Sequence, residues 1–210
     1  MLNVGKSFRV LHNDSCPPVG WRKVTCHLLS DMKMYFTRKA TWVLDDHKNP
    51  NPIGSTYVWV VSRDSIRIAF TYDALNGLDI CAVVIRNSYL QAPSPQKYFI
   101  ICKKEFGLEN IGKKALIRRA LYGGKYSGRD LRNHLHECVR HLDFVYYPAD
   151  PDVWMWPAKK IDESEYYKYD LLYTDRLQKC INITQRRNWK ILWIKGGINC
   201  NSWTLFTWTC

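Results

Sequence analysis

Two helical segments stand among many short strand-like segments, and this mixture most constrains the fold. Residues 62–75 place apolar side chains near helical spacing, and Ser62 precedes them as a candidate cap. Residues 129–142 form the second segment, whose apolar side chains share one helical face. Strand candidates rich in β-branched and aromatic residues cover 21–29, 34–44, 80–85, 98–102, 152–156 and 166–173. The pattern predicts an α+β fold.

The chain is strongly basic. Lys plus Arg number 31 and Asp plus Glu number 19, which gives a formal net charge of +12. Apolar residues at 46% and charged residues at 24% are typical of a globular chain, so wholesale disorder is excluded. The charge excess favours a polyanionic partner, nucleic acid before an acidic membrane surface.

No targeting signal is visible in the sequence. The N-terminal residues lack the long apolar stretch of a signal peptide, and no charge-free apolar run reaches the roughly 18 residues that span a bilayer. We therefore expect an intracellular protein, cytoplasmic or nuclear, that is not secreted and has no membrane partner. The 8 cysteines include no CxxC pair and are expected to be reduced thiols.

The composition changes abruptly after Arg176. Residues 177–210 contain no Asp or Glu, and they hold Trp189, Trp193, Trp203 and Trp208 of the 9 tryptophans. No helical or alternating period persists there. We predict an atypical tail that is not a native domain, produced by a break in the gene or its reading frame near position 176.

A basic belt crosses residues 103–132 and brackets a glycine turn at 122–128. Its members are Lys103, Lys104, Lys113, Lys114, Arg118, Arg119, Lys125, Arg129 and Arg132. Such a belt could neutralise phosphates, although an ordinary solvated surface is the alternative. The candidate nucleic-acid-binding residues are Lys113, Lys114, Arg118, Arg119, Lys125 and Arg129.

A histidine-rich stretch offers a separate possibility. His134, Cys138 and His141 fall at i, i+4 and i+7 of the second predicted helix, a spacing that zinc could use. The alternative is a helix with a buried cysteine and solvated histidines. No further ligand pair has finger-like spacing, which favours this alternative.

Several blocks, taken in order, resemble the polymerase core of copia-type retrotransposon polyproteins. They are VVSRDSIRIAF at 60–70, ALNGLDI at 74–80, NSYLQAP at 87–93, RALYGGKYSG at 119–128 and ADPDVW at 149–154, with TRKA at 37–40 and YTD at 173–175. The match runs from about residue 16 to residue 176. It implies a partial reverse transcriptase (RNA-directed DNA polymerase) domain, residues 16–176, with fingers and an antiparallel palm sheet backed by helices, the thumb missing. The implied partner is an RNA or DNA primer–template.

The resemblance also implies a Mg²⁺ site made of three carboxylates, and two of them are absent. The family has one Asp after the first palm strand and an Asp pair on a hairpin; the corresponding residues here are Val84, Asp175 and Arg176. Valine offers no lone pair, and arginine repels dications. Asp79 lies too far along the strand to substitute. The expected protein is catalytically inactive, with Asp175 the only metal-binding candidate.

Further positions carry over from the family with departures around them. Lys39 matches a residue that could meet a triphosphate, and Tyr89 matches an aromatic under the incoming sugar. Thr41 stands where the family usually has Arg, Asp45-Asp46 where it has two glycines, and Gly124 where it has Leu. The alternative to a decayed polymerase is a non-enzymatic, basic nucleic-acid-binding remnant or co-opted protein.

Overall fold

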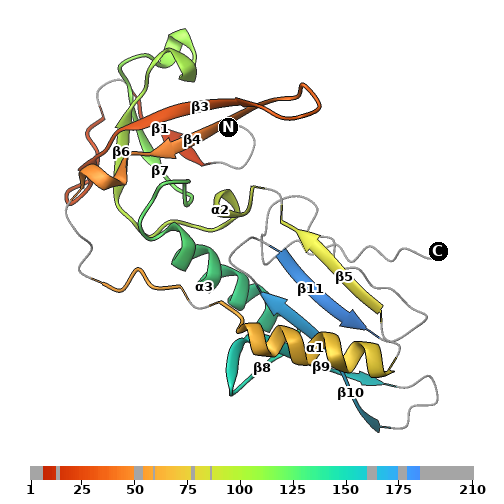
Figure 1. Cartoon of the computed structure of the whole chain (residues 1–210). Coiled ribbons are helices and arrows are strands. Elements are labelled where there is room, and N and C mark those ends of the chain that lie inside the picture. Colours follow the sequence, from red (N-terminus) through yellow and green to blue (C-terminus); the bar gives the residue numbers. More distant parts are fainter. Residues whose placement is uncertain are drawn as a thin grey trace. The chain divides into compact units, whose positions relative to one another are not determined.

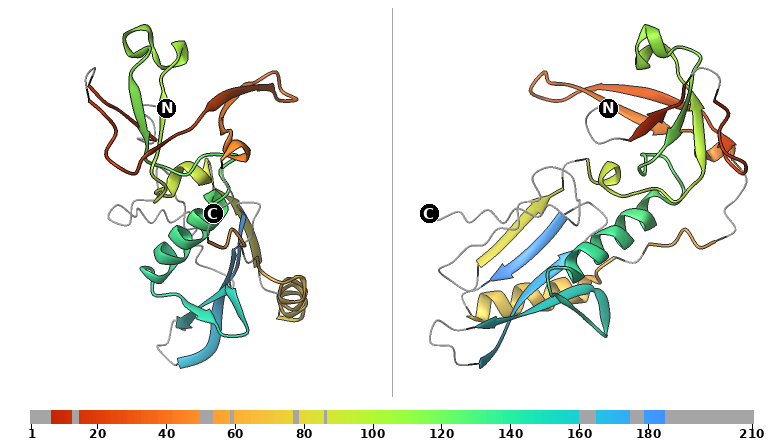
Figure 2. Two further views of the ribbon diagram at one scale, coloured as in Figure 1. Left: turned by 90° about the vertical axis from the view of Figure 1, so that its left-hand side faces the viewer. Right: turned by 180° about the vertical axis from the view of Figure 1, so that it is seen from behind.

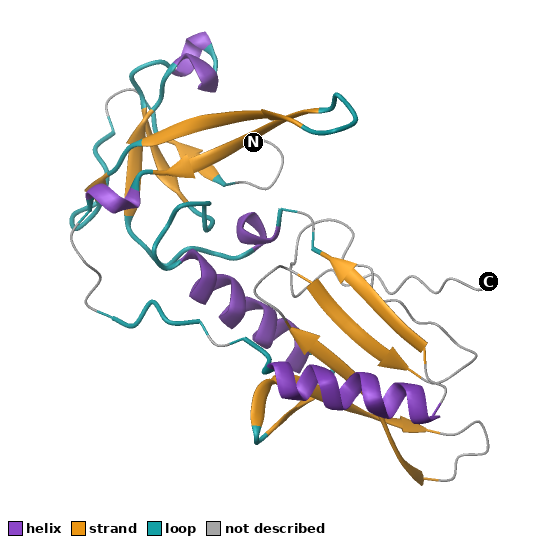
Figure 3. Cartoon of the chain, in the orientation of Figure 1, coloured by secondary structure: helices purple, strands orange, loops and turns teal. Residues whose placement is uncertain are grey.

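The chain divides into two compact units that are both discontinuous in sequence. The computed structural model describes residues 7–12, 15–49, 54–58, 60–76, 79–85, 87–159, 165–174 and 179–184, with the backbone alone for β5, β10 and β11. Unit 1 comprises Met1–Tyr57 and Asn87–His134, and unit 2 comprises Val58–Arg86 and Leu135–Cys210. Helices and strands occur in both units, so the expected α+β class is confirmed (Figure 3).

Unit 1 contains a four-stranded sheet and a separate two-stranded hairpin. The order of the sheet is β1 (Phe8–Val10), β7 (Lys114–Ile117), β6 (Tyr98–Ile101) and β2 (Arg22–Lys23). Only the β2–β6 pair is parallel. The hairpin pairs β3 (Cys26–Met32) with β4 (Arg38–Leu44), which confirms the two strands predicted over 21–44 (Figure 1).

Three aromatic side chains fix the core of unit 1. Phe8 on β1 meets Trp42 on β4 edge-on at 6.2 Å between ring centroids, and it meets Phe106 at 5.2 Å. Phe106 belongs to the 3₁₀ turn η2 (Lys104–Phe106), and its ring lies 5.0 Å from that of Trp42. Because all three are buried, each contributes about 1.5–3 kcal/mol through apolar burial. The triangle therefore joins the four-stranded sheet to the hairpin.

Unit 2 is built on a five-stranded, wholly antiparallel sheet. The strand order is β5 (Asp79–Val84), β11 (Lys179–Thr184), β10 (Glu165–Thr174), β9 (Asp150–Lys159) and β8 (Val145–Tyr147). The strands predicted over 152–156 and 166–173 correspond to β9 and β10, which pair with each other. Strand β11 was not predicted; it falls inside the segment 177–210 and pairs with both β5 and β10.

The helices pack against opposite faces of this sheet (Figure 2). Val153 and Trp154 are successive residues of β9, so their side chains leave the sheet on opposite sides. Val153 packs with residues of α1 (Arg63–Asn76), and Trp154 packs with the part of α3 (Ser127–Arg140) that belongs to unit 2. The backbone N of Ser65 donates to the Ser62 hydroxyl at 3.0 Å, which confirms the predicted cap of α1.

Candidate functional site

The end of β5 lies beside the hairpin formed by β10 and β11. Val84 pairs with Lys179 at the start of β11, and Cys180 pairs with Val83 on one side and Thr174 on the other. The last residues of β5 and β10 and the first of β11 therefore share one end of the sheet. Across two strand spacings, the ends of β5 and β10 are about 10 Å apart.

Of the three positions that the resemblance assigns to a metal site, only Val84 belongs to the described residues. Val84 ends β5, while Asp175 and Arg176 belong to the link from β10 to β11 and lie outside the described residues. Asp79 pairs with Thr184, at the opposite end of β5. The pairing of β5 with β11 therefore places Asp79 and Val84 at opposite ends of the strand, as the sequence spacing predicted.

The residues at this end do not fit a divalent-metal site. Mg²⁺ takes oxygen ligands in near-octahedral geometry, and Val84 supplies none. Arg176 adds a fixed positive charge beside Asp175, the one carboxylate of the set. A single carboxylate next to a guanidinium in sequence is a weak donor set for two dications, so the absence of a working metal site stays a prediction.

The histidine-rich stretch on α3 was the candidate zinc site. No group of three or more His, Cys, Asp or Glu side chains is placed there to hold a metal ion. Cys138 is buried and His141 is exposed, as the alternative to zinc expected. The expectation of solvated histidines is wrong for His134 and His136, which are both buried.

His136 is buried because it has a carboxylate partner on β9. Its Nε2 lies 2.9 Å from Oδ1 of Asp152, which is 1% exposed, and its ring meets Trp154 edge-on at 4.8 Å. Asp150, two residues earlier, accepts hydrogen bonds from the backbone N of Ser62 at 2.9 Å and from the Ser65 hydroxyl at 2.6 Å. The ADPDVW block thus ties α1 and α3 to β9.

The two predicted nucleotide-binding residues have different surroundings. Lys39 lies on β4, opposite Asp31 of β3, and is exposed. Tyr89 lies on the short helix α2 (Ser88–Gln91), half-buried against a small apolar cluster. Its ring meets that of Tyr122 edge-on at 4.9 Å. Tyr89 is therefore held by packing.

The six predicted phosphate-binding residues all lie in unit 1, and half of them make short internal contacts. Arg119 Nη1 donates to the Gln91 carbonyl at 2.6 Å, and Lys125 Nζ donates to the Asn49 carbonyl at 2.9 Å. Arg129 stacks over the Tyr126 ring at 4.4 Å. These contacts join the glycine turn and α3 to neighbouring segments.

Of the other three predicted residues, only Arg118 is exposed. Lys113 and Lys114 are half-buried, with Nζ 3.4 Å from Asn110 Oδ1 and 3.8 Å from Cys16 Sγ respectively. Arg118, directly after β7, is exposed. The exposed belt members also include Lys103 and Lys104. Some residues of the belt therefore make contacts within unit 1, and others form an exposed cationic surface.

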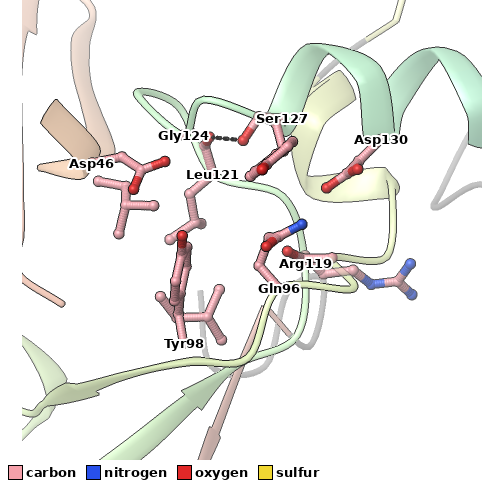
Figure 4. A pocket seen from close by; sticks show the side chains of 12 residues that line it. Asp46, Gln96, Tyr98, Arg119, Leu121, Gly124, Ser127 and Asp130 are labelled. Atoms are coloured by element: carbon pink, nitrogen blue, oxygen red, sulfur yellow. Dashed lines mark hydrogen bonds between the residues drawn. The ribbon is translucent and has the colours of Figure 1, made fainter. Parts of the chain in front are cut away.

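A small polar pocket lies where the glycine turn meets α3 and β6 (Figure 4). Its volume is about 10 Å³, room for about one water molecule and too small for a nucleotide. Tyr98, Arg119, Ser127 and Asp130 are among the residues that line it. Burial raises the pKa of the Asp130 carboxyl, and burial together with Asp46 raises the pKa of the Tyr98 hydroxyl. Apolar side chains such as Leu44, Ile117 and Leu121 line it as well, and its size does not suit a substrate.

The pair Asp45-Asp46 is a polar anchor whose role was not predicted. Asp45 accepts hydrogen bonds from the Thr25 hydroxyl at 2.8 Å and from Lys48 Nζ at 3.4 Å, and its Oδ1 lies 2.6 Å from His27 Nδ1. The Thr25 bond and these partners lower the pKa of Asp45 to about 2 despite burial. Burial, followed by the charge of Asp45, raises the pKa of Cys26 to about 12. The thiol of Cys26 is therefore unreactive at neutral pH.

Asp46 accepts hydrogen bonds that attach the glycine turn to the end of β4. Its Oδ2 accepts a hydrogen bond from the backbone N of Lys125 at 2.7 Å, and its Oδ1 accepts one from Asn49 at 2.8 Å. Gly123, two residues before Lys125, has φ +81, and a Cβ there would collide with the Leu44 carbonyl. In the sequence, the only sign of this anchor was an acidic pair in a basic chain. The pair stands where the resembling family usually has two glycines.

None of the described helices is long and apolar enough to cross a bilayer. The chain matches no protein-family model, and no curated protein matches it significantly.

Proposed function

We propose that the chain is a reverse-transcriptase-type fingers and palm domain of copia type that binds primer–template nucleic acid without extending it. The register of unit 2 carries the proposal. Val84 at the end of β5 and the link between β10 and β11 fall at one end of an antiparallel sheet. That is the arrangement expected of a palm whose catalytic carboxylates come from these segments.

Lack of polymerase activity follows from the residues at those positions. Nucleotide addition by this family depends on divalent metals that activate the primer hydroxyl and hold the triphosphate. Val84 and Arg176 replace two of the three ligands, and Asp79, at the far end of β5, is not placed to compensate. Asp175 alone cannot hold two dications against a neighbouring guanidinium.

Binding of nucleic acid is supported by the open part of the basic belt. Arg118, Lys103 and Lys104 are exposed in unit 1, and the whole chain carries a net charge of +12. Phosphate contacts by such residues release counterions and make the affinity fall as salt rises. The alternative, a non-enzymatic nucleic-acid-binding remnant or co-opted protein, also depends on this surface, and a salt titration separates both from an inert relic.

A salt titration of binding tests the proposal. The full chain is titrated against a fluorescent RNA–DNA primer–template by anisotropy at increasing KCl. We expect a log–log slope of about −2 to −4, as when roughly three or four phosphates are neutralised. Arg118→Ala should reduce the magnitude of the slope by about 1 and weaken binding at all sequences.

The matched control is Arg67→Ala. Arg67 is exposed on α1 in unit 2 and does not belong to the belt, so this variant should keep the slope of the unmodified chain. A slope near zero for the unmodified chain, or equal losses in the two variants, would remove the belt as a nucleic-acid surface.

A further inference from the structure

The end of the β3–β4 hairpin displays large apolar side chains to solvent. Met34, Tyr35 and Phe36 are successive residues of the turn and are 93%, 90% and 85% exposed. Met32, at the end of β3, is 57% exposed. The hairpin extends away from the other strands of unit 1 (Figure 1). Exposed apolar patches mark interaction sites. Residues 32–36 are called the hairpin tip below.

The backbone of this turn suits a glycine better than the phenylalanine it carries. The backbone N of Phe36 donates to the Lys33 carbonyl at 2.9 Å, and that of Lys33 donates to the Thr37 carbonyl at 3.0 Å. Phe36 adopts a left-handed conformation, with φ 55, at a turn position that glycine usually occupies. A bulky side chain is rare there because its Cβ crowds the backbone. Strain of this kind clusters at functional positions, which indicates that the exposed ring has a role in binding.

Positive charges flank the apolar side chains of the tip. Lys33 lies within the turn, and Arg38 and Lys39 are the first two residues of β4. All three side chains are exposed. Asp31, the one acidic residue in 31–39, pairs with Lys39 across the hairpin. Its Oδ1 accepts a hydrogen bond from the following backbone N at 2.8 Å. This end of the hairpin therefore complements a surface that is both negatively charged and apolar beneath its charges.

An anionic lipid surface has both properties. Apolar and aromatic side chains enter the boundary between headgroups and acyl chains, while Lys and Arg remain near the lipid phosphates. Nucleic acid would complement the cations and could stack on the rings of Tyr35 and Phe36. Stacking would not use the flexible thioether side chains of Met32 and Met34, which lie beside the rings in sequence. The mixture of aliphatic and aromatic side chains therefore favours lipid.

We propose that the hairpin tip binds an anionic lipid surface, with Met34, Tyr35 and Phe36 in the interface and Lys33 and Arg38 at the headgroup phosphates. Surface binding needs no membrane-spanning element, so it departs from the expectation of no membrane partner, which rested on the lack of a spanning run. The inference needs neither polymerase descent nor nucleic-acid binding by the belt. It therefore holds or fails separately from the proposed function.

Sedimentation of the full chain with lipid vesicles tests the proposal. The vesicles contain equal parts of phosphatidylcholine and phosphatidylserine, or phosphatidylcholine alone. We expect the chain to pellet with the anionic vesicles and to stay largely in solution with the neutral ones. Phe36→Gly should weaken binding to the anionic vesicles roughly ten- to hundredfold, because one large apolar side chain no longer leaves water. Glycine fits the left-handed turn, so urea unfolding should show that this variant is no less stable than the unmodified chain.

The matched control is Leu108→Ala. Leu108 lies in unit 1 on the 3₁₀ turn η3 (Leu108–Asn110), outside the hairpin, and is 82% exposed. Its loss should leave vesicle binding unchanged. Lys33→Gln should weaken binding to the anionic vesicles roughly fivefold, as expected when one charge near an anionic lipid surface is lost.

Equal pelleting of the unmodified chain and Phe36→Gly would show that net charge alone binds the vesicles, and it would overturn the proposal. No pelleting with either vesicle, or equal losses in Phe36→Gly and Leu108→Ala, would overturn it as well. Phe36→Gly is also titrated against the fluorescent primer–template. Weaker binding there, with vesicle binding unchanged, would assign the hairpin tip to nucleic acid instead of lipid.

Discussion

At the scale of single residues, the buried pair Asp45-Asp46 is part of the hydrogen-bonded structure of unit 1. Both carboxylates accept hydrogen bonds from residues of this unit. Through these bonds they hold the end of β4 against Thr25 and the glycine turn. Carboxylates left without such partners would be costly to bury. The two side chains therefore stabilise the fold through their partners.

Asp45→Asn should lower stability by about 1–2 kcal/mol at pH 7, because hydrogen bonds to a charged acceptor are lost. The pKa of Asp45 is lowered from 3.8 to about 2 in the folded chain. Its contribution is therefore fully present above pH 4 and is lost as the pH falls toward 2. Urea unfolding at pH 7 and at pH values from 4 to 2 should show the two chains converging.

Asp64→Asn serves as the control for this prediction, since the Asp64 side chain is 82% exposed. It should change stability by less than about 0.5 kcal/mol at either pH. A gap between Asp45→Asn and the unmodified chain that stays constant down to pH 2 would mean that the charge of Asp45 does not stabilise the fold.

At the scale of elements, the sequence predicted those with a strong local signal. These signals are local in sequence. They are the apolar spacing and Ser62 cap of α1, the apolar face of α3 and the β-branched run of β5. Strands β1, β7, β8 and β11 were not predicted. They are short or polar, and their strand state depends on partners far away in sequence. β11 shows this most clearly, since both of its neighbours precede it in the chain.

Ile181→Pro tests whether β11 is an integral strand. Ile181 pairs with Ala82 of β5 and Tyr173 of β10, so a proline there removes a ladder donor inside the sheet. We expect a loss of at least about 2 kcal/mol, measured by urea unfolding followed by circular dichroism. The conservative Ile181→Val keeps the backbone donor and the β-branched side chain, so it should cost much less than the proline. Equal stability of the proline variant would show that residues 179–184 do not contribute to the sheet.

At the scale of the whole molecule, part of the candidate site could be predicted and part could not. The register of unit 2 places Val84 at the end of the sheet where β10 ends and β11 begins, while the metal-site roles carried over from the resemblance stay a prediction. The sequence could not predict which basic residues of the belt make internal contacts and which are exposed. Whether Arg119 meets a phosphate or the Gln91 carbonyl depends on tertiary contacts that charge and spacing do not encode.

Primer extension in a buffer in which the full chain binds its primer–template tests the central claim most directly. A labelled primer on an RNA template is incubated with dNTPs and Mg²⁺ or Mn²⁺, beside an active reverse transcriptase that shows the substrate to be competent. In the proposed function Val84 and Arg176 occupy the positions of two metal-binding carboxylates, so we predict binding with no extension above the protein-free background. Incorporation of even one nucleotide above that background, under either metal, would contradict the account.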